Sequence, residues 1–194
     1  MAEVVYYVAA SVDGYIATPD GAVDWLTPFH TAGDDHGYAA FLATLGGIVM
    51  GRRTYDQVRG FGPWPYTGLD CRVVTSRPLS EAPDRVMPVA TPAEAVAGWA
   101  DRRVWLVGGT TLLDGFRAAK LVREYHVFVM PVLLGGGVPL FHTGPAASLR
   151  LVSAAGLPSG IVECRYRVMD GAPGAPIELP SLRPDFDLGM HSGE

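Results

Sequence analysis

The chain has 194 residues and a mass of 20.7 kDa, which corresponds to one domain or to one domain with a tail. Hydrophobic residues make up 48% and charged residues 18%, a profile that excludes a fully disordered chain. The two cysteines are too few for a disulfide framework, and no apolar run approaches the roughly 20 residues of a membrane-spanning helix. The first residues lack the pattern of a signal peptide. We therefore expect a cytoplasmic protein with reduced thiols and no membrane partner.

The net charge of −5 is unevenly distributed. Residues 170–194 contain five acids and one base and carry −4, so the first 169 residues carry only −1. Such a neutral body has no broad basic face, and we expect no nucleic-acid partner. Fourteen of the fifteen basic residues are arginines, whose planar fork suits the phosphate of a small anionic ligand.

The first predicted strand covers residues 4–10, where β-branched and aromatic residues occupy both faces. This pattern is typical of a central strand that is covered on both sides. A turn-rich stretch follows, and the next apolar periodicity predicts a helix over about residues 34–45 with Asp34 or Asp35 as its cap. A short buried strand at 48–50 comes next.

Strands and helices then alternate along the middle of the chain. The expected elements are helical turns at 54–58, strands at 71–75, 86–89 and 104–107, and helices at 91–99 and 111–119. The later part is dominated by strands, namely a long one at 124–134 and a hairpin of 149–154 with 161–168. The fold class is therefore an α/β three-layer sandwich with a mixed, mostly parallel central sheet and an antiparallel edge.

The end of the chain differs from the rest in composition. Residues 170–194 contain four prolines and four glycines, and their apolar residues show no period. We therefore divide the chain into a domain over residues 1–169 and a Pro/Gly-rich acidic tail over residues 170–194, disordered or extended on a surface.

Three loops that directly follow predicted strands carry residues suited to an anion. In the first, a strand ends at Gly51, and Arg52, Arg53 and Thr54 lead into a helix, whose N-terminal N–H groups attract phosphate. The second contains Thr75, Ser76 and Arg77, and the third contains Gly108, Gly109, Thr110 and Thr111 but lacks the G-x-G-x-x-G pattern. Each loop alone is equally explained as an ordinary turn. Together they predict a nucleotide site, because ligands of open α/β sheets bind at the carboxyl ends of strands.

Several segments, taken in order, resemble those of a known family. They are SVDGYIA at 11–17, DW at 24–25, MGRRTY at 50–55, VGG at 107–109 and PVLLGGGVPLF at 131–141. The set resembles the dihydrofolate reductase-like fold, and more closely the reductase domain of the bacterial riboflavin-biosynthesis deaminase-reductase family, over about residues 3–169. The zinc signature of a nucleoside deaminase is absent from the sequence, so the chain is similar to a stand-alone reductase domain.

The resemblance implies NADPH as the hydride donor. By position, Gly51, Arg52, Arg53 and Thr54 would hold its phosphates, and Thr75, Ser76 and Arg77 would surround the adenosine ribose and its 2′-phosphate. Gly108, Gly109, Thr110 and Thr111 would receive the diphosphate, and Ala9, Ile16 and Ala17 would line the nicotinamide site. The arginines by themselves also favour NADPH over NADH. The five histidines are scattered without ligand spacing, so we expect no metal.

Two carboxylates are candidates for the catalytic acid. Asp13 lies in the loop after the first strand, near the expected nicotinamide, and could equally be a turn residue. Asp35 corresponds to the helix carboxylate of folate reductases and could equally be a cap. We favour Asp13, because the resemblance of its loop to the riboflavin-pathway reductases is the closer one.

Aromatic residues flank the expected site and could stack on a planar substrate. They are Trp25, Phe29, Tyr55, Phe61, Trp64 and Tyr66, with Trp25, Tyr55 and Trp64 as the substrate-binding candidates. The predicted function is NADPH-dependent reduction of a small planar nitrogen heterocycle of the pteridine, pyrimidine or flavin-precursor type. The alternatives are a true dihydrofolate reductase, if Asp35 is a buried carboxylate, and a non-catalytic nucleotide-binding dimer, if side chains block the site. We expect a homodimer, since the strand at 124–134 and its glycine-rich continuation would expose apolar surface.

Overall fold

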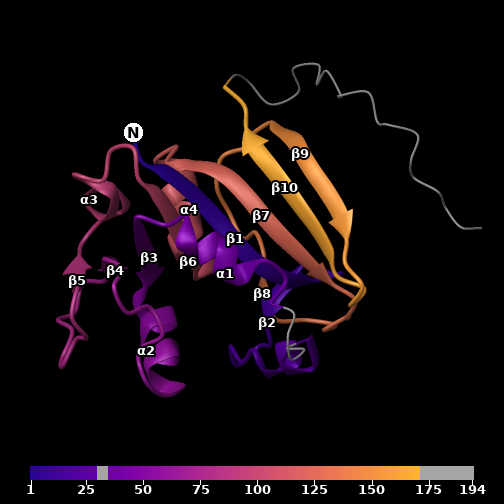
Figure 1. Ribbon diagram of the computed structural model, residues 1–194, viewed down its shortest axis with the longest axis horizontal. Helices are drawn as coiled ribbons and strands as arrows, with labels where there is room; N and C mark the ends of the chain where they lie inside the picture. Colours follow the sequence, from indigo (N-terminus) through magenta and orange to yellow (C-terminus); the bar gives the residue numbers. More distant parts are fainter. Residues whose placement is uncertain (30–34, 171–194) are drawn as a thin grey trace, which may run out of the picture.

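The computed structural model describes residues 1–29 and 35–170 (Figure 1). Asp34 and the predicted tail after Asp170 lie outside the described residues. The strands are β1 (Glu3–Ser11), β2 (Tyr15–Ala17), β3 (Gly47–Gly51), β4 (Cys71–Val74), β5 (Val86–Val89), β6 (Arg103–Gly108), β7 (Val122–Met130), β8 (Val138–Pro139), β9 (Leu149–Gly156) and β10 (Val162–Val168). The helices are the 3₁₀ helix η1 (Asp24–Phe29), α1 (Tyr38–Ala43), α2 (Arg52–Gly60), α3 (Pro92–Val96) and α4 (Thr110–Ala118).

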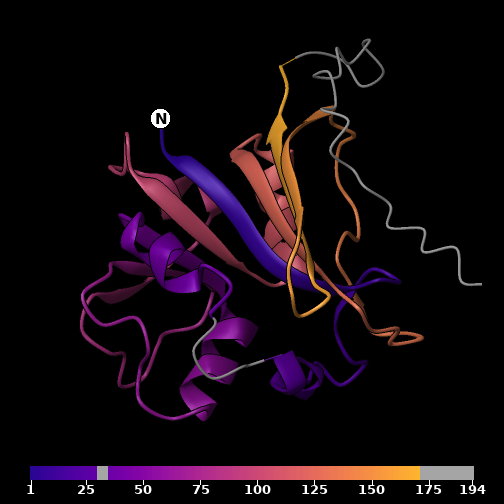
Figure 2. The ribbon, with the colours of Figure 1, turned by 45° about the vertical axis from the view of Figure 1, so that its right-hand side comes forward.

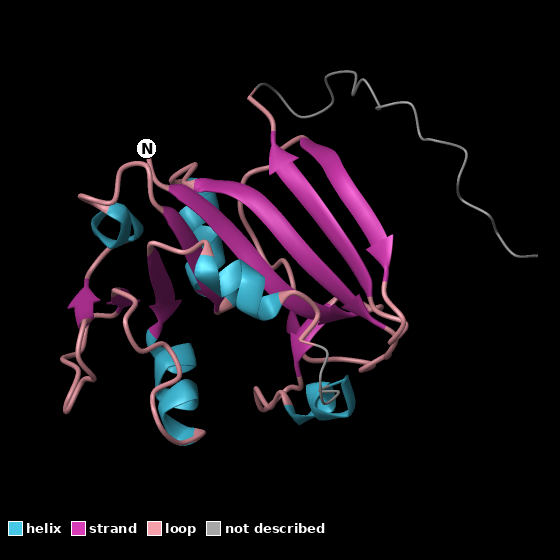
Figure 3. Ribbon diagram, viewed as in Figure 1, coloured by secondary structure: helices cyan, strands magenta, loops and turns pink. Residues whose placement is uncertain are grey.

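Eight strands form one sheet in the order β5-β4-β3-β6-β1-β7-β10-β9, and β2 pairs with β8 in a small second sheet. The pairings from β5 to β7 are parallel, whereas β10 runs antiparallel to both β7 and β9. Helices flank the sheet, and the β9–β10 hairpin forms one end of it (Figures 1 and 3). The predicted fold class, a mixed and mostly parallel sheet with an antiparallel edge, is confirmed.

Strand β1 lies between β6 and β7, as its two-sided apolar pattern predicts. On one face, Val4 and Tyr6 pack in a core cluster with residues of α4, including Leu113 and Phe116. On the other face, Val5 packs in a second cluster with residues of α1 and α2. Successive side chains of a strand point to opposite faces, so these helices cover the sheet from both sides (Figure 2).

Some element ends differ from the sequence-based prediction. Helix α1 is shorter than the predicted 34–45 and begins at Tyr38. Helix α2 begins at Arg52, directly after β3 and two residues earlier than predicted. Strand β7 ends at Met130 rather than at residue 134. The reason is that Pro131 has no N–H and that the Val132 N–H donates a hydrogen bond to the Met130 carbonyl at 2.7 Å. Strands β2 and β8 are absent from the sequence-based prediction, because they are too short to show a period.

Candidate functional site

Two helices begin at the same edge of the sheet. Strand β3 ends at Gly51 and α2 follows at Arg52, while β6 ends at Gly108 and α4 follows at Thr110. Strands β3 and β6 are parallel neighbours, so the N-termini of these two nine-residue helices lie close together. The first N–H groups of a helix have no partner within it and carry partial positive charge. This edge of the sheet can therefore hold an anionic ligand.

The turn into α4 requires glycine. Gly108 and Gly109 have φ angles of 146° and 88°, in a region that side-chain-bearing residues rarely adopt. A shift in the pairing of β3 with β6 accompanies the turn, since Val49 pairs with Leu106 and Met50 with Gly108. A Cβ on Gly109 would lie 3.7 Å from Thr54 Oγ1, so the two helix starts approach each other across this glycine.

A cavity of about 860 Å³ opens at this edge of the sheet. Its lining contains both helix starts and also apolar side chains such as Leu26 and Val138. Ten of the predicted cofactor residues line it: Ala9, Ile16, Ala17, Arg52, Arg53, Thr54, Gly108, Gly109, Thr110 and Thr111. The described lining residues include two arginines and no carboxylate.

The other four predicted cofactor residues lie next to the cavity lining rather than on it. Gly51 directly precedes Arg52, and Thr75, Ser76 and Arg77 follow Val74, which lines the cavity. Thr75 Oγ1 accepts a hydrogen bond from the Arg77 N–H at 3.1 Å and so shapes this loop. The side chains of Ser76 and Arg77 are exposed.

The arginines of α2 are oriented by neighbouring groups. Arg52 donates through Nε to the Asp56 carboxylate at 2.8 and 2.9 Å and through Nη1 to the Pro78 carbonyl at 2.9 Å. The bond to the Pro78 carbonyl ties the start of α2 to the loop after β4. Arg53 donates through Nη2 to the Asp20 carbonyl at 3.3 Å. These bonds arrange two cations in the lining of the cavity at low conformational cost.

The three aromatic residues predicted to bind the substrate do not line the cavity. Tyr55 belongs to α2 and is buried in a core cluster. Trp64 packs edge to face against Tyr66, with 5.3 Å between the ring centroids. Trp25 packs against a cluster that contains Phe128. The structure thus places Trp25, Tyr55 and Trp64 outside the cavity lining, and their large apolar rings pack between loop and core.

A different aromatic group lines the cavity, and the sequence analysis largely missed it. Its members are Tyr7, Tyr38, Phe61, Tyr66 and Trp105. Only Phe61 and Tyr66 had been noted as flanking aromatics. For Tyr7 a signal existed, because it is two residues before Ala9 on β1 and must share its face.

Asp13 is exposed and binds backbone rather than the cavity. Its carboxylate accepts hydrogen bonds from the N–H groups of Leu134 at 3.1 Å and Gly135 at 2.7 Å. Hydrogen bonds from Ser11 and from these two N–H groups lower the pKa of Asp13. Asp13 therefore anchors the loop after β7 to the loop after β1, and a carboxylate that stays ionised is a poor proton donor.

Asp35 is a helix-capping residue. Its exposed carboxylate accepts hydrogen bonds from the N–H groups of Ala39 at 2.7 Å and Gly37 at 3.0 Å, and these bonds lower its pKa. Asp35 does not line the cavity. The capping role that the sequence suggests for Asp35 accounts for its position in the structure.

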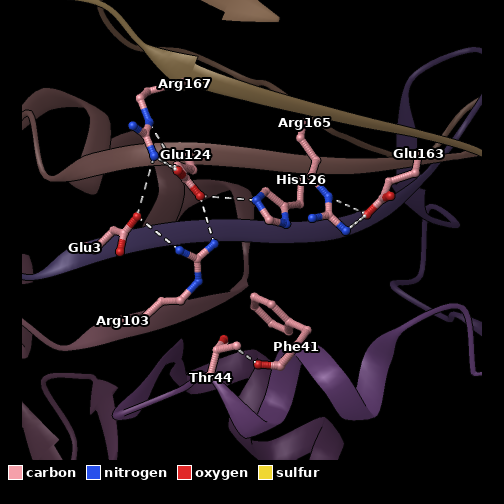
Figure 4. A network of polar contacts seen from close by, with 9 residues as sticks. All are labelled: Glu3, Phe41, Thr44, Arg103, Glu124, His126, Glu163, Arg165 and Arg167. Atoms are coloured by element: carbon pink, nitrogen blue, oxygen red, sulfur yellow. Dashed lines mark hydrogen bonds and ion pairs between the residues drawn. The ribbon is translucent and has the colours of Figure 1, made fainter. Parts of the chain in front are cut away.

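A ladder of charged side chains crosses the sheet on the face covered by α1 (Figure 4). Glu124 on β7 accepts hydrogen bonds from Arg103 Nη2 at 2.8 Å and from Arg167 Nε at 3.2 Å. His126 Nε2 lies 3.3 Å from the same carboxylate, and its ring is 6.1 Å from that of Tyr7. Burial, followed by the charge of Arg165, lowers the pKa of His126. The ladder thus lies directly behind one aromatic wall of the cavity.

Residues 1–29 and 35–170 contain neither a candidate metal centre nor a candidate membrane-spanning helix. No cluster of three or more His, Cys, Asp or Glu side chains there could hold a metal ion. None of the helices in these ranges is long and apolar enough to cross a membrane.

The sheet order and the cavity define an α/β protein of the dihydrofolate reductase-like class. Residues 85–162 match the family described as the RibD C-terminal domain. The protein YwjB of Bacillus subtilis (strain 168), which is uncharacterized, is 36% identical over 143 residues, covering 71% of this chain and 82% of YwjB. YyaP of the same organism, also uncharacterized, is 26% identical over 182 residues, covering 84% of this chain and 93% of YyaP. The chain belongs to the RibD C-terminal domain family.

Solved structures agree with this assignment. A protein of Shewanella sp. PV-4, provisionally named as a riboflavin biosynthesis protein, is 29% identical with a TM-score of 0.76, covering 87% of this chain and 99% of that one. A pyrimidine reductase-like protein of Corynebacterium diphtheriae shares the fold at 14% identity, with a TM-score of 0.65 and coverages of 87% and 92%. A deaminase/reductase of Thermotoga maritima shares it at 13% identity and a TM-score of 0.65, with 87% of this chain covering 57% of the longer one.

Proposed function

We propose that this protein is an NADPH-dependent reductase of a planar nitrogen heterocycle. The observation that carries the proposal is the cavity at the carboxyl ends of β1, β3 and β6, whose lining combines two arginines and two helix starts with aromatic side chains. NADPH combines the matching groups, because it carries anionic phosphates and a flat nicotinamide ring. When bound, NADPH supplies a hydride.

The residues present fit this cofactor. The helix starts at Arg52 and Thr110, together with the open backbone at Gly108 and Gly109, suit the diphosphate. Arg52 and the exposed Arg77 suit the 2′-phosphate, because Arg52 is bonded to the loop that contains Arg77. The small side chain of Ala9 in the lining leaves room for a flat ring.

The substrate class is supported by the aromatic side chains that line the cavity and by the relatives. Tyr7, Tyr38 and Trp105 offer ring faces and edges to a planar ligand. The Corynebacterium diphtheriae protein is named as pyrimidine reductase-like, and the Thermotoga maritima protein as a 5-amino-6-(5-phosphoribosylamino)uracil reductase. A pyrimidine or a related fused heterocycle is therefore the substrate class we propose.

The two alternatives are less well supported. A true dihydrofolate reductase requires Asp35 to be a buried carboxylate, whereas Asp35 is exposed and caps α1. A non-catalytic nucleotide-binding protein is expected to have side chains that block the site, whereas the cavity is open and measures about 860 Å³.

Calorimetry and a turnover assay test the proposal. We expect NADPH to bind at least tenfold more tightly than NADH, because one charge-assisted contact to phosphate is worth about 1.5–3 kcal/mol. The loss of absorbance by NADPH is then followed with 5-amino-6-(5-phosphoribosylamino)uracil and, separately, with dihydrofolate. Equal affinity for both nucleotides would contradict the proposal, and faster turnover of dihydrofolate would favour the folate-reductase alternative.

A further inference from the structure

The small sheet of β2 and β8 contributes one wall of the cavity, although the two strands lie far apart in the chain. Ile16 and Ala17 of β2 and Val138 of β8 line the cavity. These three side chains carry neither a charge nor a hydrogen-bonding group. This β2–β8 wall therefore suits an uncharged ring of a ligand, whereas the N-termini of α2 and α4 suit its phosphates.

Few backbone bonds hold the β2–β8 wall together. Ala17 pairs with Val138 and Tyr15 with Pro139, with an irregularity between the two pairs. Pro139 has no N–H and cannot donate a hydrogen bond to β2. The Leu140 N–H adds one bond to a carbonyl of the loop between β1 and β2, at 2.8 Å. Because so short a pair of strands is marginal by itself, the position of β8 depends on the loop that leads into it.

The carboxylate of Asp13 holds that loop. Asp13 lies between β1 and β2, and each of its two oxygens accepts a hydrogen bond from the loop between β7 and β8. The Leu134 N–H donates to Oδ1 at 3.1 Å, and the Gly135 N–H donates to Oδ2 at 2.7 Å. Gly135 has a φ of 70°, and successive N–H groups in a turn of this kind form a concave site for an anion. Asp13 thus joins the two loops from which β2 and β8 start.

The remainder of the loop between β7 and β8 is held less firmly. The side chain of Leu133 is 71% exposed, so apolar burial does not fix it. The Val12 N–H donates to the Val132 carbonyl at 2.9 Å and holds the start of the loop. The bonds to Asp13 hold the turn just before Val138, and bonds to a charged acceptor are stronger than neutral ones.

Resting on the proposed function, we propose that Asp13 is a positioning residue for the cofactor: its carboxylate fixes β8 against β2 and so shapes the wall that takes the nicotinamide ring. Asp13 does not line the cavity and acts through Ile16, Ala17 and Val138, which do. This role requires an ionised carboxylate, and hydrogen bonds from Ser11 and from the two N–H groups lower the pKa of Asp13.

Calorimetry with NADPH and with adenosine 2′,5′-bisphosphate tests the assignment, because the second ligand has the 2′-phosphate end of the cofactor but no nicotinamide. We expect Asp13→Ala to weaken NADPH binding about tenfold, since the wall is no longer held ready for the ring, and to leave binding of the bisphosphate unchanged. Asp13→Asn keeps the shape of the side chain and one acceptor oxygen but loses the charge. We expect it to weaken NADPH binding less than Asp13→Ala does.

Asp101→Asn is the control. Asp101 is also an exposed aspartate, and it precedes β6 at the edge of the sheet opposite to the cavity. Its carboxylate pairs with the N-terminal amine of Met1 at 3.6 Å. We expect this variant to bind both ligands as the wild type does.

The fluorescence of bound NADPH provides a second readout, which does not depend on affinity when it is measured at saturation. The emission of a reduced nicotinamide rises when the ring leaves water for an apolar surface. We expect the rise to be smaller in Asp13→Ala than in the wild type and unchanged in Asp101→Asn.

Three results would overturn the role of Asp13 while NADPH binding by the wild type, and with it the proposed function, stands. They are wild-type NADPH binding by Asp13→Ala, an equal loss of affinity for NADPH and the bisphosphate in that variant, and wild-type fluorescence of its bound NADPH at saturation. A wild type that binds neither ligand would instead overturn the proposed function itself.

Discussion

At the scale of single residues, one glycine decides how closely two loops near the cavity approach each other. Gly137 has a φ of 148°, and a Cβ on it would overlap the carbonyl oxygen of Ala17. The neighbouring Gly136 has open space in the same direction. We expect Gly137→Ala to lower the free energy of unfolding by about 1–3 kcal/mol and Gly136→Ala to change it by less than about 0.5 kcal/mol. Urea denaturation measures both, and similar midpoints for the two variants would contradict this explanation.

Arg77 tests the preference for NADPH at the same scale. Its side chain is exposed, so its removal should leave the fold intact. We expect Arg77→Gln to weaken NADPH binding about tenfold, through loss of a charge-assisted contact, and to leave NADH binding unchanged. Arg150→Gln, at an exposed arginine of β9, is the control. Calorimetry in which Arg77→Gln binds NADPH like the wild type would remove Arg77 from the 2′-phosphate site.

At the scale of elements, the carboxylate of Glu124 ties β7 to both neighbouring parts of the sheet. Arg103 comes from β6 and Arg167 from β10, and both bond to this buried group (Figure 4). We expect Glu124→Gln to lower the free energy of unfolding at pH 7 by about 2–3 kcal/mol, because two arginines lose a charged partner. Glu3→Gln removes an exposed carboxylate from the same ladder and should cost less than about 1 kcal/mol. Equal losses in urea denaturation would show that burial does not matter here.

The same carboxylate predicts a dependence of stability on pH. Burial alone would raise the pKa of Glu124, but hydrogen bonds from Arg167 and Arg103 outweigh it and lower the pKa from 4.5 to about 2. The unfolded chain therefore binds this proton more readily than the folded one, so the stabilisation is complete above pH 4.5 and is lost as the pH falls toward 2. Denaturation curves at a series of pH values measure this loss, and Glu124→Gln should show a flatter slope. An unchanged slope in the variant would contradict the assignment.

At the scale of the whole molecule, exposed apolar residues gather at the hairpin end of the sheet. The sequence predicts a homodimer from the strand at 124–134 and its glycine-rich continuation. In the structure, β10 pairs with the edge of β7 that faces away from β1. Leu133 and Phe141, at the end of that strand prediction and in its glycine-rich continuation, are exposed. The hairpin adds Val152 and Val162, which are 56% and 41% exposed, and β9 is the edge strand. An exposed edge strand with apolar side chains is a template for pairing with another copy.

We therefore expect a homodimer formed through the β9 edge. Sedimentation should give a mass of about twice the 20.7 kDa of the chain, and Val152→Lys should shift it toward the monomer. Met87→Lys is the matched control, since Met87 is 51% exposed on β5 at the opposite edge of the sheet. A wild type that sediments as a monomer, or equal effects of the two lysines, would contradict this interface.

The sequence by itself determined the local parts of this protein. Apolar patterns placed the strands of the main sheet, because burial on one or both faces of a strand leaves a period that is readable within a few residues. Glycines and arginines directly after strands marked the loops at Gly51 and Gly108, because the chemistry of an anion site is local to a strand end and a helix start. Seven residues of these two loops line the cavity.

Only the tertiary structure decided which residues meet. Strand β6 lies beside β3, although other elements separate them in the chain, and this order brings the starts of α2 and α4 together. The aromatic wall combines Tyr7, Tyr38, Tyr66 and Trp105 from distant segments, whereas Trp25, Tyr55 and Trp64, which flank the motifs in sequence, pack away from the cavity. An aromatic ring in a sequence can equally serve the core or a ligand, and the choice depends on which face of its element is covered by another part of the chain.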